Sequence, residues 1–343
     1  MTGPAARSAA TLESVAAAAG VSRATASRVL TGSPRVSDAA RDRVLAAASA
    51  LSYVPNAAAR SLVTRRSDAV AFVVCEPEEK FFSDPFFATV LKGAHRVIAE
   101  HRLQLVFVVV ATDTDRDQLE RFASGGHLDG AMFVSLHGKE PMPARLHALG
   151  LPVVLAGRSL DPDASGLPVV DVDNAHGAAV ATQRLIERGA TRIATITGPR
   201  DMAGAMDRLD GWSDALLAAG REPDESHIET GDYTLEGGHR SMLRLLDRVP
   251  DVDGVFAASD LMAAGALRAL AERGLRAPED VAIVGFDDIP LALATQPGLT
   301  TIRQPMEELG RRMAQTLVAA LTGEGEPALH VRLPTRLVAR ASG

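Results

Sequence analysis

Short apolar runs alternate with longer amphipathic segments along most of the chain, and this alternation constrains the fold more than any other feature. The runs form a first block at residues 69–74, 105–110 and 130–135, and a second at residues 169–172, 193–197, 255–257 and 281–285. Parallel strands are buried on both faces, read as continuous apolar runs and need helical crossovers between them. The sequence therefore predicts a parallel α/β architecture with two similar, doubly wound subdomains.

A segment rich in Asp, Pro, Ser and Gly, residues 161–168, separates the two blocks. Such composition interrupts helices and strands, so we expect the chain to cross there from one subdomain to the other. Ligands of doubly wound sheets bind outside the carboxyl ends of the strands. A cleft between the two subdomains is therefore the expected binding site.

The N-terminal region predicts a separate three-helix unit. Thr11 and Ser22 are N-cap candidates for two short helices, and Gly20 allows the positive φ of a tight turn between them. A third helix is expected after Ser37 and before Pro55. The residues expected to form the shared core are Leu12, Val15, Val21, Val29, Leu30, Val44, Leu45, Ala48 and Leu51.

With this core, the second helix turns hydroxyls, a small residue and arginines outward. Hydroxyls suit phosphate oxygens, a small apolar residue suits a thymine methyl group, and arginine can fork onto guanine. Residues 1–66 hold nine arginines against three acidic residues, whereas the whole chain has a net charge of −7. A basic module on an acidic body indicates a nucleic-acid-binding protein, although a solvated basic helix face without a partner has the same charge.

Composition limits the classes of protein to which the chain can belong. It has 343 residues, 46% of them hydrophobic, which is enough for two or three domains with ordinary cores. Residues 1–10 lack the pattern of a secretory signal, and no apolar window is long enough to span a bilayer. We therefore expect a cytoplasmic protein without a membrane partner. The single cysteine, Cys75, ends an apolar run and is expected to be buried.

Signatures of the common enzyme classes are missing from the sequence. No GxGxxG follows the first expected strand, and there is no phosphate-binding loop and no GxSxG. The nine histidines never stand at metal-ligand spacing with another histidine or a cysteine. Asp171 with Asp173, or Asp287 with Asp288, could act as acid and base only with a raised pKa. We expect no enzyme, no cofactor and no metal site.

The N-terminal region resembles a known family. The stretches TLESVAAAAGVSRATASRVL at 11–30, VS at 36–37, RDRV at 41–44 and YVPNAAARSL at 53–62 closely resemble the headpiece of the LacI/GalR family of bacterial transcription regulators. This resemblance implies a helix-turn-helix DNA-binding headpiece at residues 11–55.

The resemblance also implies roles for single residues of the second helix. Three of them would read base edges in the major groove, namely Arg23, Ala24 and Arg28, and three would hold phosphates, namely Ser22, Thr25 and Ser27. Two positions depart from the family pattern: Ala26 stands where the family usually has valine, and Thr31 where it usually has asparagine. The change at Ala26 affects the packing beneath the second helix, and the change at Thr31 affects the DNA contact expected just after that helix.

Residues 56–66 are expected to form a hinge helix and a linker. A helix of about six or seven residues is unstable alone in water, so the segment should fold only with a partner. The resemblance implies that it orders where two subunits meet in the minor groove, with Leu62 wedged into a base step and Asn56 and Arg60 on the DNA. The alternative is a flexible linker whose leucine packs on the body.

The body, residues 67–343, resembles the family core, which is similar to periplasmic sugar-binding proteins. Matching stretches include DPFF at 84–87, ASDLMAAG at 258–265, VAIVGFDD at 281–288 and LTTIRQ at 299–304. The resemblance implies that the chain crosses three times between the subdomains. The expected boundaries are residues 67–165 and 299–326 for the first subdomain and residues 166–298 and 327–343 for the second, with the final strand near Val331 in the second.

An effector is expected in the cleft between the subdomains. The resemblance implies that Arg208, Tyr233, Ser259 and Asp287 bind it, and Phe82, Asp84, Phe86 and Arg158 are also expected to bind it. Arginine and aspartate fork onto neighbouring hydroxyls, and an aromatic face covers the apolar side of a sugar. For Asp260 and Asp288, which lie beside expected helix starts, capping is an equal alternative to binding.

The resemblance implies a homodimeric regulator, with a tetramer as an alternative, that represses carbohydrate-utilisation genes and is released from a palindromic operator by a small sugar. The stretches EPEEKFFSDPFF at 76–87, SLHG at 135–138 and TGPRDM at 197–202 are most similar to actinobacterial regulators of cellulose and cellobiose use. Cellobiose or a related β-glucoside is therefore the expected effector. The alternatives are a corepressor-dependent regulator that answers a purine or another metabolite, and a sugar-processing enzyme.

Overall fold

The computed structural model describes residues 10–30, 35–53, 66–324 and 328–343. The chain divides into two compact units, residues 1–67 and residues 68–343, which are described separately. We call them the headpiece and the body.

Within its described residues, the headpiece contains three helices, α1 (Leu12–Ala19), α2 (Arg23–Leu30) and α3 (Asp38–Ala50). Thr11 caps α1 as expected: its side chain accepts a hydrogen bond from the backbone N–H of Ser14, whose hydroxyl accepts one from the N–H of Thr11. Gly20 follows α1 with φ of 64°, the left-handed conformation that the turn into α2 requires.

The headpiece core differs from the predicted one at two positions. Its buried residues are Val15, Ala16, Ala19, Ala26, Val29, Val44, Ala47 and Ala48, with Leu12, Val21, Leu30, Val36 and Tyr53 packed against them. Leu45 and Leu51 were expected in this core but are 50% and 38% exposed. Leu45 follows the fully buried Val44 and turns to the outer face of α3, and Leu51 lies just beyond the end of that helix.

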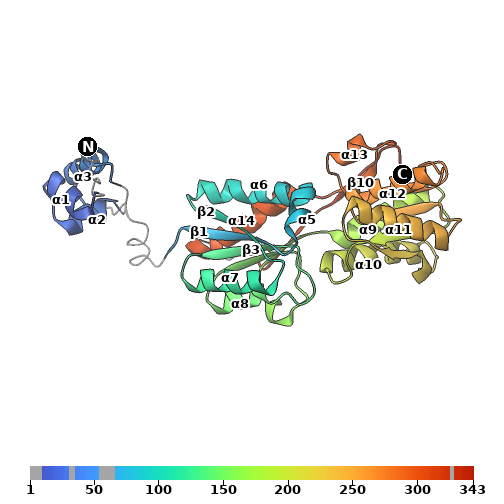
Figure 1. Ribbon diagram of the computed structural model, residues 1–343, viewed down its shortest axis with the longest axis horizontal. Coiled ribbons are helices and arrows are strands. Elements are labelled where there is room, and N and C mark those ends of the chain that lie inside the picture. The colour runs from blue at the N-terminus through green and yellow to red at the C-terminus, as the bar shows by residue number, and fades with distance from the viewer. Residues whose placement is uncertain (1–9, 31–34, 54–65, 325–327) are drawn as a thin grey trace, which may run out of the picture. The chain divides into compact units, whose positions relative to one another are not determined.

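The described part of the body contains two six-stranded sheets (Figure 1). The first has the order β11-β5-β4-β3-β1-β2, formed by β1 (Ala69–Val74), β2 (Gln104–Val109), β3 (Gly130–Val134), β4 (Val153–Ala156), β5 (Val169–Val172) and β11 (His330–Leu333). The second has the order β12-β10-β9-β8-β6-β7, formed by β6 (Ile193–Thr197), β7 (Ile228–Thr230), β8 (Gly254–Ala257), β9 (Ala282–Asp287), β10 (Thr300–Arg303) and β12 (Arg336–Val338). All pairings are parallel except that of β10 with β12.

Helices cover both faces of each sheet, so the predicted doubly wound α/β architecture is confirmed. The first subdomain carries α5 (Glu78–Ser83), α6 (Pro85–Glu100), α7 (Asp113–Ser124), α8 (Met142–Ala148) and α14 (Met306–Thr322), and a 3-10 turn at Pro162–Ala164. The second carries α9 (Asn174–Glu187), α10 (Ala203–Ala218), α11 (Leu235–Arg248), α12 (Asp260–Glu272) and α13 (Leu291–Ala294), and a 3-10 turn at Glu225–His227.

Strand β1 shows how the two faces of the first sheet are assigned. Val70, Phe72 and Val74 pack with residues of α6 and α14, whereas Ala71 and Val73 pack with residues of α7 and α8. Both sets are buried because successive residues of a strand point to opposite faces. In Figure 1, α6 and α7 accordingly lie on opposite sides of this sheet. Cys75 is buried on the α7 side as expected, and burial raises the pKa of its thiol.

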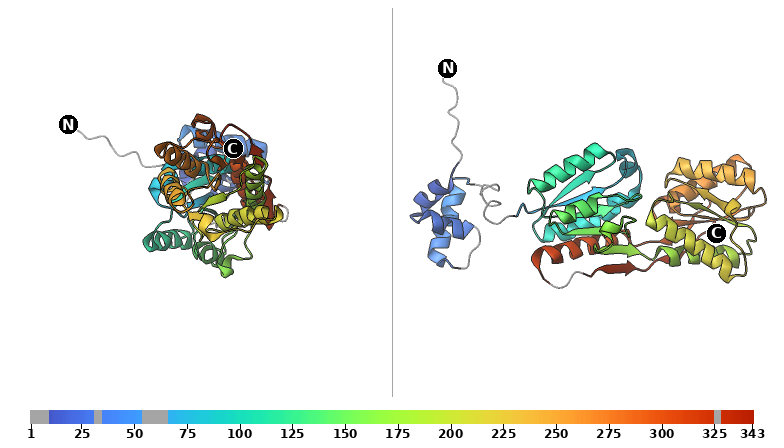
Figure 2. Two further views of the ribbon diagram at one scale, coloured as in Figure 1. Left: turned by 90° about the vertical axis from the view of Figure 1, so that its right-hand side faces the viewer. Right: turned by 90° about the horizontal axis from the view of Figure 1, so that it is seen from below.

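Helices α6 and α14 approach each other through two glycines. A Cβ added to Gly93 would lie 1.9 Å from the carbonyl oxygen of Glu307, and one added to Gly310 would lie 1.9 Å from that of Val90. Only glycine permits this spacing, which fixes α14 against the first subdomain (Figure 2).

The chain crosses between the subdomains three times, as the resemblance implied, but not at the expected places. The crossings lie near Asp173, after β5; near Gln304, after β10; and near Pro334, after β11. The expected boundaries at residues 165/166, 298/299 and 326/327 are wrong for these three strands. Strands β5 and β11 pair with each other in the first sheet, and β10 pairs with β9 in the second.

The strand that contains Val331 therefore belongs to the first sheet, and the final strand of the second sheet is β12. The composition of residues 161–168 correctly indicates a loop between strands. It does not show which sheet the next strand, β5, joins, because tertiary contacts decide that pairing. Among the helices that the structure describes, none is long and apolar enough to cross a membrane.

Candidate functional site

Helix α2 exposes most of the side chains that the sequence predicted to face outward. The exposed residues are Arg23, Ala24 and Arg28, and the half-buried ones are Thr25 and Ser27. Ala26 and Val29, by contrast, are buried in the headpiece core. The helix thus presents two guanidinium groups, a methyl group and two hydroxyls on its outer side, the set of groups that could contact bases and phosphates.

Ser22 and Arg23 have local partners in the free headpiece. The Ser22 hydroxyl accepts a hydrogen bond of 3.1 Å from the backbone N–H of Thr25 and lies 2.9 Å from its hydroxyl. Ser22 therefore caps α2, as predicted. Arg23 Nε lies 2.9 Å from Glu13, but the two side chains are 71% and 60% exposed. Such an exposed ion pair is weak and leaves the guanidinium available to a polyanion.

Asn56, Arg60 and Leu62 lie outside the described residues, as does Thr31. The hinge helix, the minor-groove wedge and the contacts assigned to these residues stay predictions from the sequence.

A cavity lies between the two subdomains of the body, outside the carboxyl ends of their strands. Seven of the eight residues expected to bind an effector line it: Asp84, Phe86, Arg158, Arg208, Tyr233, Ser259 and Asp287. The eighth, Phe82, is 79% exposed and is not part of the lining. Helix α5 instead turns its neighbour Phe81 inward onto Phe107, at 4.4 Å between ring centroids, and the structure does not bring Phe82 together with the other seven.

Arg208 is held rigidly inside the cavity. Its Nε donates a hydrogen bond of 2.9 Å to the side-chain oxygen of Asn174, and one terminal nitrogen donates a bond of 2.5 Å to the carbonyl oxygen of Ala258. The guanidinium also stacks on the ring of Phe286, with 3.7 Å from Cζ to the centroid. These contacts leave the second terminal nitrogen to donate hydrogen bonds to a ligand.

Asp287 stands in a strained backbone conformation at the end of β9. Its φ is 124°, in a region that non-glycine residues rarely adopt, and its side chain accepts a hydrogen bond from the amide of Gln304. Burial raises the pKa of Asp287 well above its ordinary value, and the charge of Arg208 opposes that effect. Ser135 and Tyr233, which also line the cavity, have positive φ as well. Strained residues therefore gather at this cavity.

Tyr233 packs into space that Gly198 leaves free. A Cβ added to Gly198 would lie 2.1 Å from Cζ of the Tyr233 ring. Two cations approach the ring: Nζ of Lys80 is 5.5 Å and Cζ of Arg208 is 5.9 Å from its centroid. Burial raises the pKa of the Tyr233 hydroxyl, so the group stays protonated and can donate a hydrogen bond.

The two aspartates for which capping and binding were equal alternatives do not line the cavity. Asp260 is buried and accepts a hydrogen bond of 2.9 Å from the backbone N–H of Ile289. Asp288 forms ion pairs with Arg303 and Arg340. Burial by itself would raise the pKa of Asp288, but the two arginines outweigh it and hold that pKa below its ordinary value. Both carboxylates thus serve the internal structure of the second subdomain.

Several lining residues were not predicted as ligand contacts. The polar ones among them are Glu76, Lys80, Ser135, Asp171, Asn174 and Gln304. Each lies just beyond β1, β3 or β10, within or just after β5, or on α5. Their position at carboxyl strand ends was a usable signal for Glu76, Ser135 and Gln304. Burial raises the pKa of Asp171 to about 6.

Polar contacts join the two subdomains beside the cavity. Arg158, which follows β4, donates a hydrogen bond of 2.6 Å to Asp207 on α10. His137, which follows β3, lies 3.1 Å from the carboxylate of Asp201. Both pairs link a loop of the first subdomain to the first turns of α10 or to the loop that precedes it.

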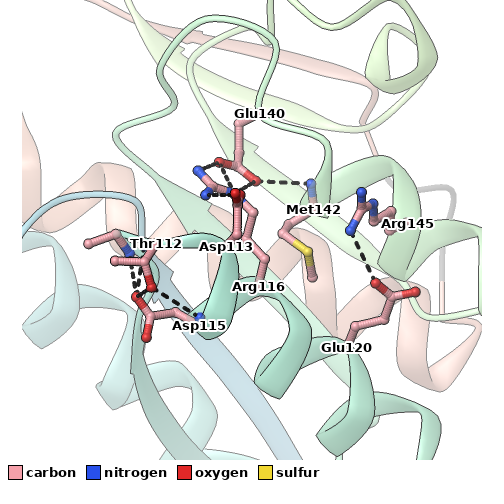
Figure 3. A network of polar contacts seen from close by, with 9 residues as sticks. Thr112, Asp113, Asp115, Arg116, Glu120, Glu140, Met142 and Arg145 are labelled. Atoms are coloured by element: carbon pink, nitrogen blue, oxygen red, sulfur yellow. Dashed lines mark hydrogen bonds and ion pairs between the residues drawn. The ribbon is translucent and has the colours of Figure 1, made fainter.

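The loop that carries His137 is anchored at its far end by a buried ion pair (Figure 3). Arg116 on α7 forks onto the carboxylate of Glu140, with Nε at 3.1 and 3.0 Å and a terminal nitrogen at 2.6 Å. Glu140 also accepts a hydrogen bond of 3.1 Å from the backbone N–H of Met142. The Glu140 side chain is only 2% exposed, so this pair fixes the loop in place. Within the described residues, no group of His, Cys, Asp and Glu is arranged to hold a metal ion.

Comparisons with known proteins match both units. Residues 11–56 match the family model of bacterial regulatory proteins of the lacI family, and residues 182–343 match that of the periplasmic binding protein-like domain. The chain is 47% identical over 333 residues to the HTH-type transcriptional regulator CelR of Thermobifida fusca, covering 97% of this chain and 98% of that protein.

Two solved structures share the fold. The transcriptional regulator CelR-cellobiose complex is 46% identical, has a TM-score of 0.79, and covers 97% of this chain and 100% of its own. The lac repressor dimer bound to operator and the anti-inducer ONPF is 24% identical, has a TM-score of 0.83, and covers 98% of this chain and 99% of its own. The likeness to the lac repressor, at 24% identity, shows a shared fold alone.

Proposed function

Because the chain belongs to the LacI family of bacterial regulatory proteins, we propose that it represses carbohydrate-utilisation genes and releases its operator when cellobiose enters the cleft. The observation that carries the proposal is the joint presence of an exposed, arginine-bearing α2 and a separate cavity lined by side chains that bind hydroxyls. One unit contacts DNA and the other contacts the effector. We place this protein in the cytoplasm, where its operator would be.

The chemistry of the cavity supports a neutral saccharide. Its acidic and basic lining residues are Glu76, Lys80, Asp84, Arg158, Asp171, Arg208 and Asp287. Carboxylates are at least as numerous as cations there, so a phosphorylated sugar or a nucleotide would lack a surplus of positive partners. Arg208 can fork onto neighbouring hydroxyls, and the rings of Tyr233 and Phe86 can cover the apolar face of a sugar. The similar CelR structure is a complex with cellobiose, and this supports cellobiose as the first candidate for the effector.

The headpiece supports a sequence-specific DNA contact. Arg28 and Arg23 would fork onto guanines and Ala24 would contact a base edge, with Ser22, Thr25 and Ser27 on phosphates. A homodimer would present two such helices, so the operator should be a palindrome. In this proposal Leu62 enters the minor groove between the two half-sites, with Asn56 and Arg60 beside it.

The coupling between the two sites is a population shift. The effector favours one arrangement of the two subdomains, and that arrangement holds the paired headpieces in a geometry that fits the operator less well. The same two sites would also serve a corepressor, whose binding would strengthen operator binding instead of weakening it. Catalysis on the bound sugar is not part of the proposal, so we expect the sugar to be recovered unchanged.

Calorimetric titration tests the effector assignment directly. We would titrate the protein with cellobiose, glucose, maltose, trehalose and guanine, and measure operator binding with each compound on a palindrome selected in vitro. We expect cellobiose to bind most tightly and to release the DNA. Tightest binding by guanine together with a stronger operator complex would contradict both the effector class and the sign.

A further inference from the structure

His137 lies between two carboxylates that belong to different subdomains. Its Nε2 is 3.0 Å from Oε1 of Glu76, and its Nδ1 is 3.1 Å from both carboxylate oxygens of Asp201. Glu76 follows β1 in the first subdomain, and Asp201 follows β6 in the second. The N–H of Gly138 also donates a hydrogen bond of 2.8 Å to the carbonyl oxygen of Asp201. Residues 137 and 138 therefore bridge the subdomains beside the cavity.

The number of protons on His137 decides whether this bridge is complete. A neutral imidazole has one N–H and one nitrogen lone pair, whereas an imidazolium has two N–H groups. Because both ring nitrogens of His137 face carboxylate oxygens, only the imidazolium can donate to both. In the neutral form one nitrogen lone pair would face a carboxylate, and that contact would become repulsive.

Glu76 is the member of this group that reaches the effector cavity. It is 4% exposed and lines the cavity, and it accepts hydrogen bonds from Lys80 Nζ at 2.7 Å and from the Ser135 hydroxyl at 2.6 Å. Burial alone would raise the pKa of Glu76, but His137, Lys80 and Ser135 outweigh it and lower that pKa. The carboxylate is thus ionised, fixed in place and available as an acceptor for a ligand hydroxyl.

We propose that His137, as an imidazolium, is a positioning residue for effector binding: it fixes Glu76 toward the cavity and joins the two subdomains in the arrangement that encloses the ligand. Because the effector selects the arrangement in which the bridge is complete, binding should raise the pKa of His137 further and be accompanied by proton uptake around neutral pH. This inference rests on the proposed function, because the binding experiments that test it use cellobiose as the effector. The hydrogen bond to Glu76, followed by the contact with Asp201, raises the pKa of His137 above 6.5, which supports the geometry.

Other charged groups surround this bridge. Lys80 on α5 and Asp84 at the start of α6 lie on the Glu76 side, and Arg158 pairs with Asp207 on α10. Asp171 and Asp260 have pKa values raised by burial to about 6 and about 7. These groups can also change the pH dependence of cellobiose affinity. We therefore assign to His137 only the part of that pH dependence that is lost when His137 is substituted.

The test is calorimetry of cellobiose binding in two buffers that differ in ionisation enthalpy, at pH values from about 7 to about 9. A group with a raised pKa keeps its interaction below that pKa and loses it as the pH rises through it. Wild-type protein should take up protons on binding, and its affinity should fall by about threefold to tenfold over this range. His137→Gln, which cannot gain a proton, should bind with less proton uptake and a flatter profile.

His239→Gln is the matched control. His239 also pairs with a carboxylate, at 2.8 Å from Glu272, but it joins α11 to α12 within one subdomain. This variant should keep the wild-type proton uptake. Equal proton uptake in wild type and His137→Gln would overturn the proposal.

A measurement without effector separates this inference from the proposed function. NMR titration of the ligand-free protein should give His137 a pKa above the ordinary 6.5, and Asp201→Asn should lower it. Equal pKa values in wild type and Asp201→Asn would overturn the bridge, whether or not cellobiose binds. Absence of any heat with cellobiose, together with a pKa that depends on Asp201, would contradict the effector and support the bridge.

Discussion

The guanidinium of Arg208 lies over the ring of Phe286, with 3.7 Å between Cζ and the ring centroid. Helix α10 supplies the arginine and strand β9 the phenylalanine, so a residue of the cavity is positioned by the core of the second subdomain. The stack and the bonds to Asn174 and Ala258 define one orientation of the guanidinium plane.

Arg208→Lys should weaken cellobiose binding without unfolding the protein. Lysine keeps the charge but loses the planar fork and the stack, so we expect the affinity to fall by about tenfold to a hundredfold, or about 1.4 to 2.7 kcal/mol. Calorimetry measures this change. Arg192→Lys is the control, since Arg192 pairs with Asp251 on the surface with both side chains more than half exposed. Equal affinities in the two variants would remove Arg208 from the site.

Gly198→Ala should displace the Tyr233 ring. The new methyl carbon would lie 2.1 Å from Cζ and 2.2 Å from the hydroxyl oxygen of Tyr233, so the ring has to move. We expect cellobiose affinity to fall by about tenfold while the headpiece keeps its affinity for DNA. Gly166→Ala is the matched control because a Cβ there would meet nothing within 4 Å. A wild-type affinity in Gly198→Ala would show that the ring does not touch the ligand.

The Asp171 carboxyl should make stability depend on pH. Burial raises its pKa from 3.8 to about 6, so its favourable contribution is complete below 3.8 and is lost as the pH rises through about 6. The free energy of unfolding of Asp171→Asn, relative to wild type, should therefore increase from pH 4 to pH 7 by at most about 3 kcal/mol. Urea unfolding at each pH measures the difference. A difference that stays constant with pH would mean that Asp171 is ionised throughout.

Arg28→Ala and Ser27→Ala should separate base reading from phosphate binding. Loss of an arginine fork onto guanine should cost about 1–3 kcal/mol at the operator and relax one base position. Loss of Ser27 should weaken binding more evenly across DNA sequences. Gel shifts on the operator, on single-base variants and on random DNA give these values. Equal losses for Arg28→Ala on operator and random DNA would return Arg28 to a phosphate-binding role.

Local patterns of the sequence were sufficient for the elements. Apolar runs and helical periodicity predicted both doubly wound subdomains, because each pattern depends on a few neighbouring residues. The places of Arg208, Tyr233, Ser259 and Asp287 in the cleft were implied by the family resemblance, and the cavity lining agrees with them.

Features that depend on tertiary pairing could not be read in this way. The membership of β5, β10 and β11 in their sheets follows from partners far away in the sequence. Phe82 was grouped with the cavity residues, although it lies outside their lining, because the sequence does not show which of two adjacent phenylalanines α5 turns inward. The bridge between His137 and Asp201 joins residues of different subdomains, and neither position carries a local signal of the other.

The most direct test of the account is release of the operator by cellobiose, measured by fluorescence anisotropy of a labelled palindromic operator in wild type and in Asp287→Ala. We expect the ligand-free affinities for DNA to be equal in both, because Asp287 lies in the cavity of the body and not in the headpiece. Cellobiose should dissociate the wild-type complex and leave the Asp287→Ala complex intact. Undiminished operator binding by wild type in saturating cellobiose, or equal release in both proteins, would contradict the account.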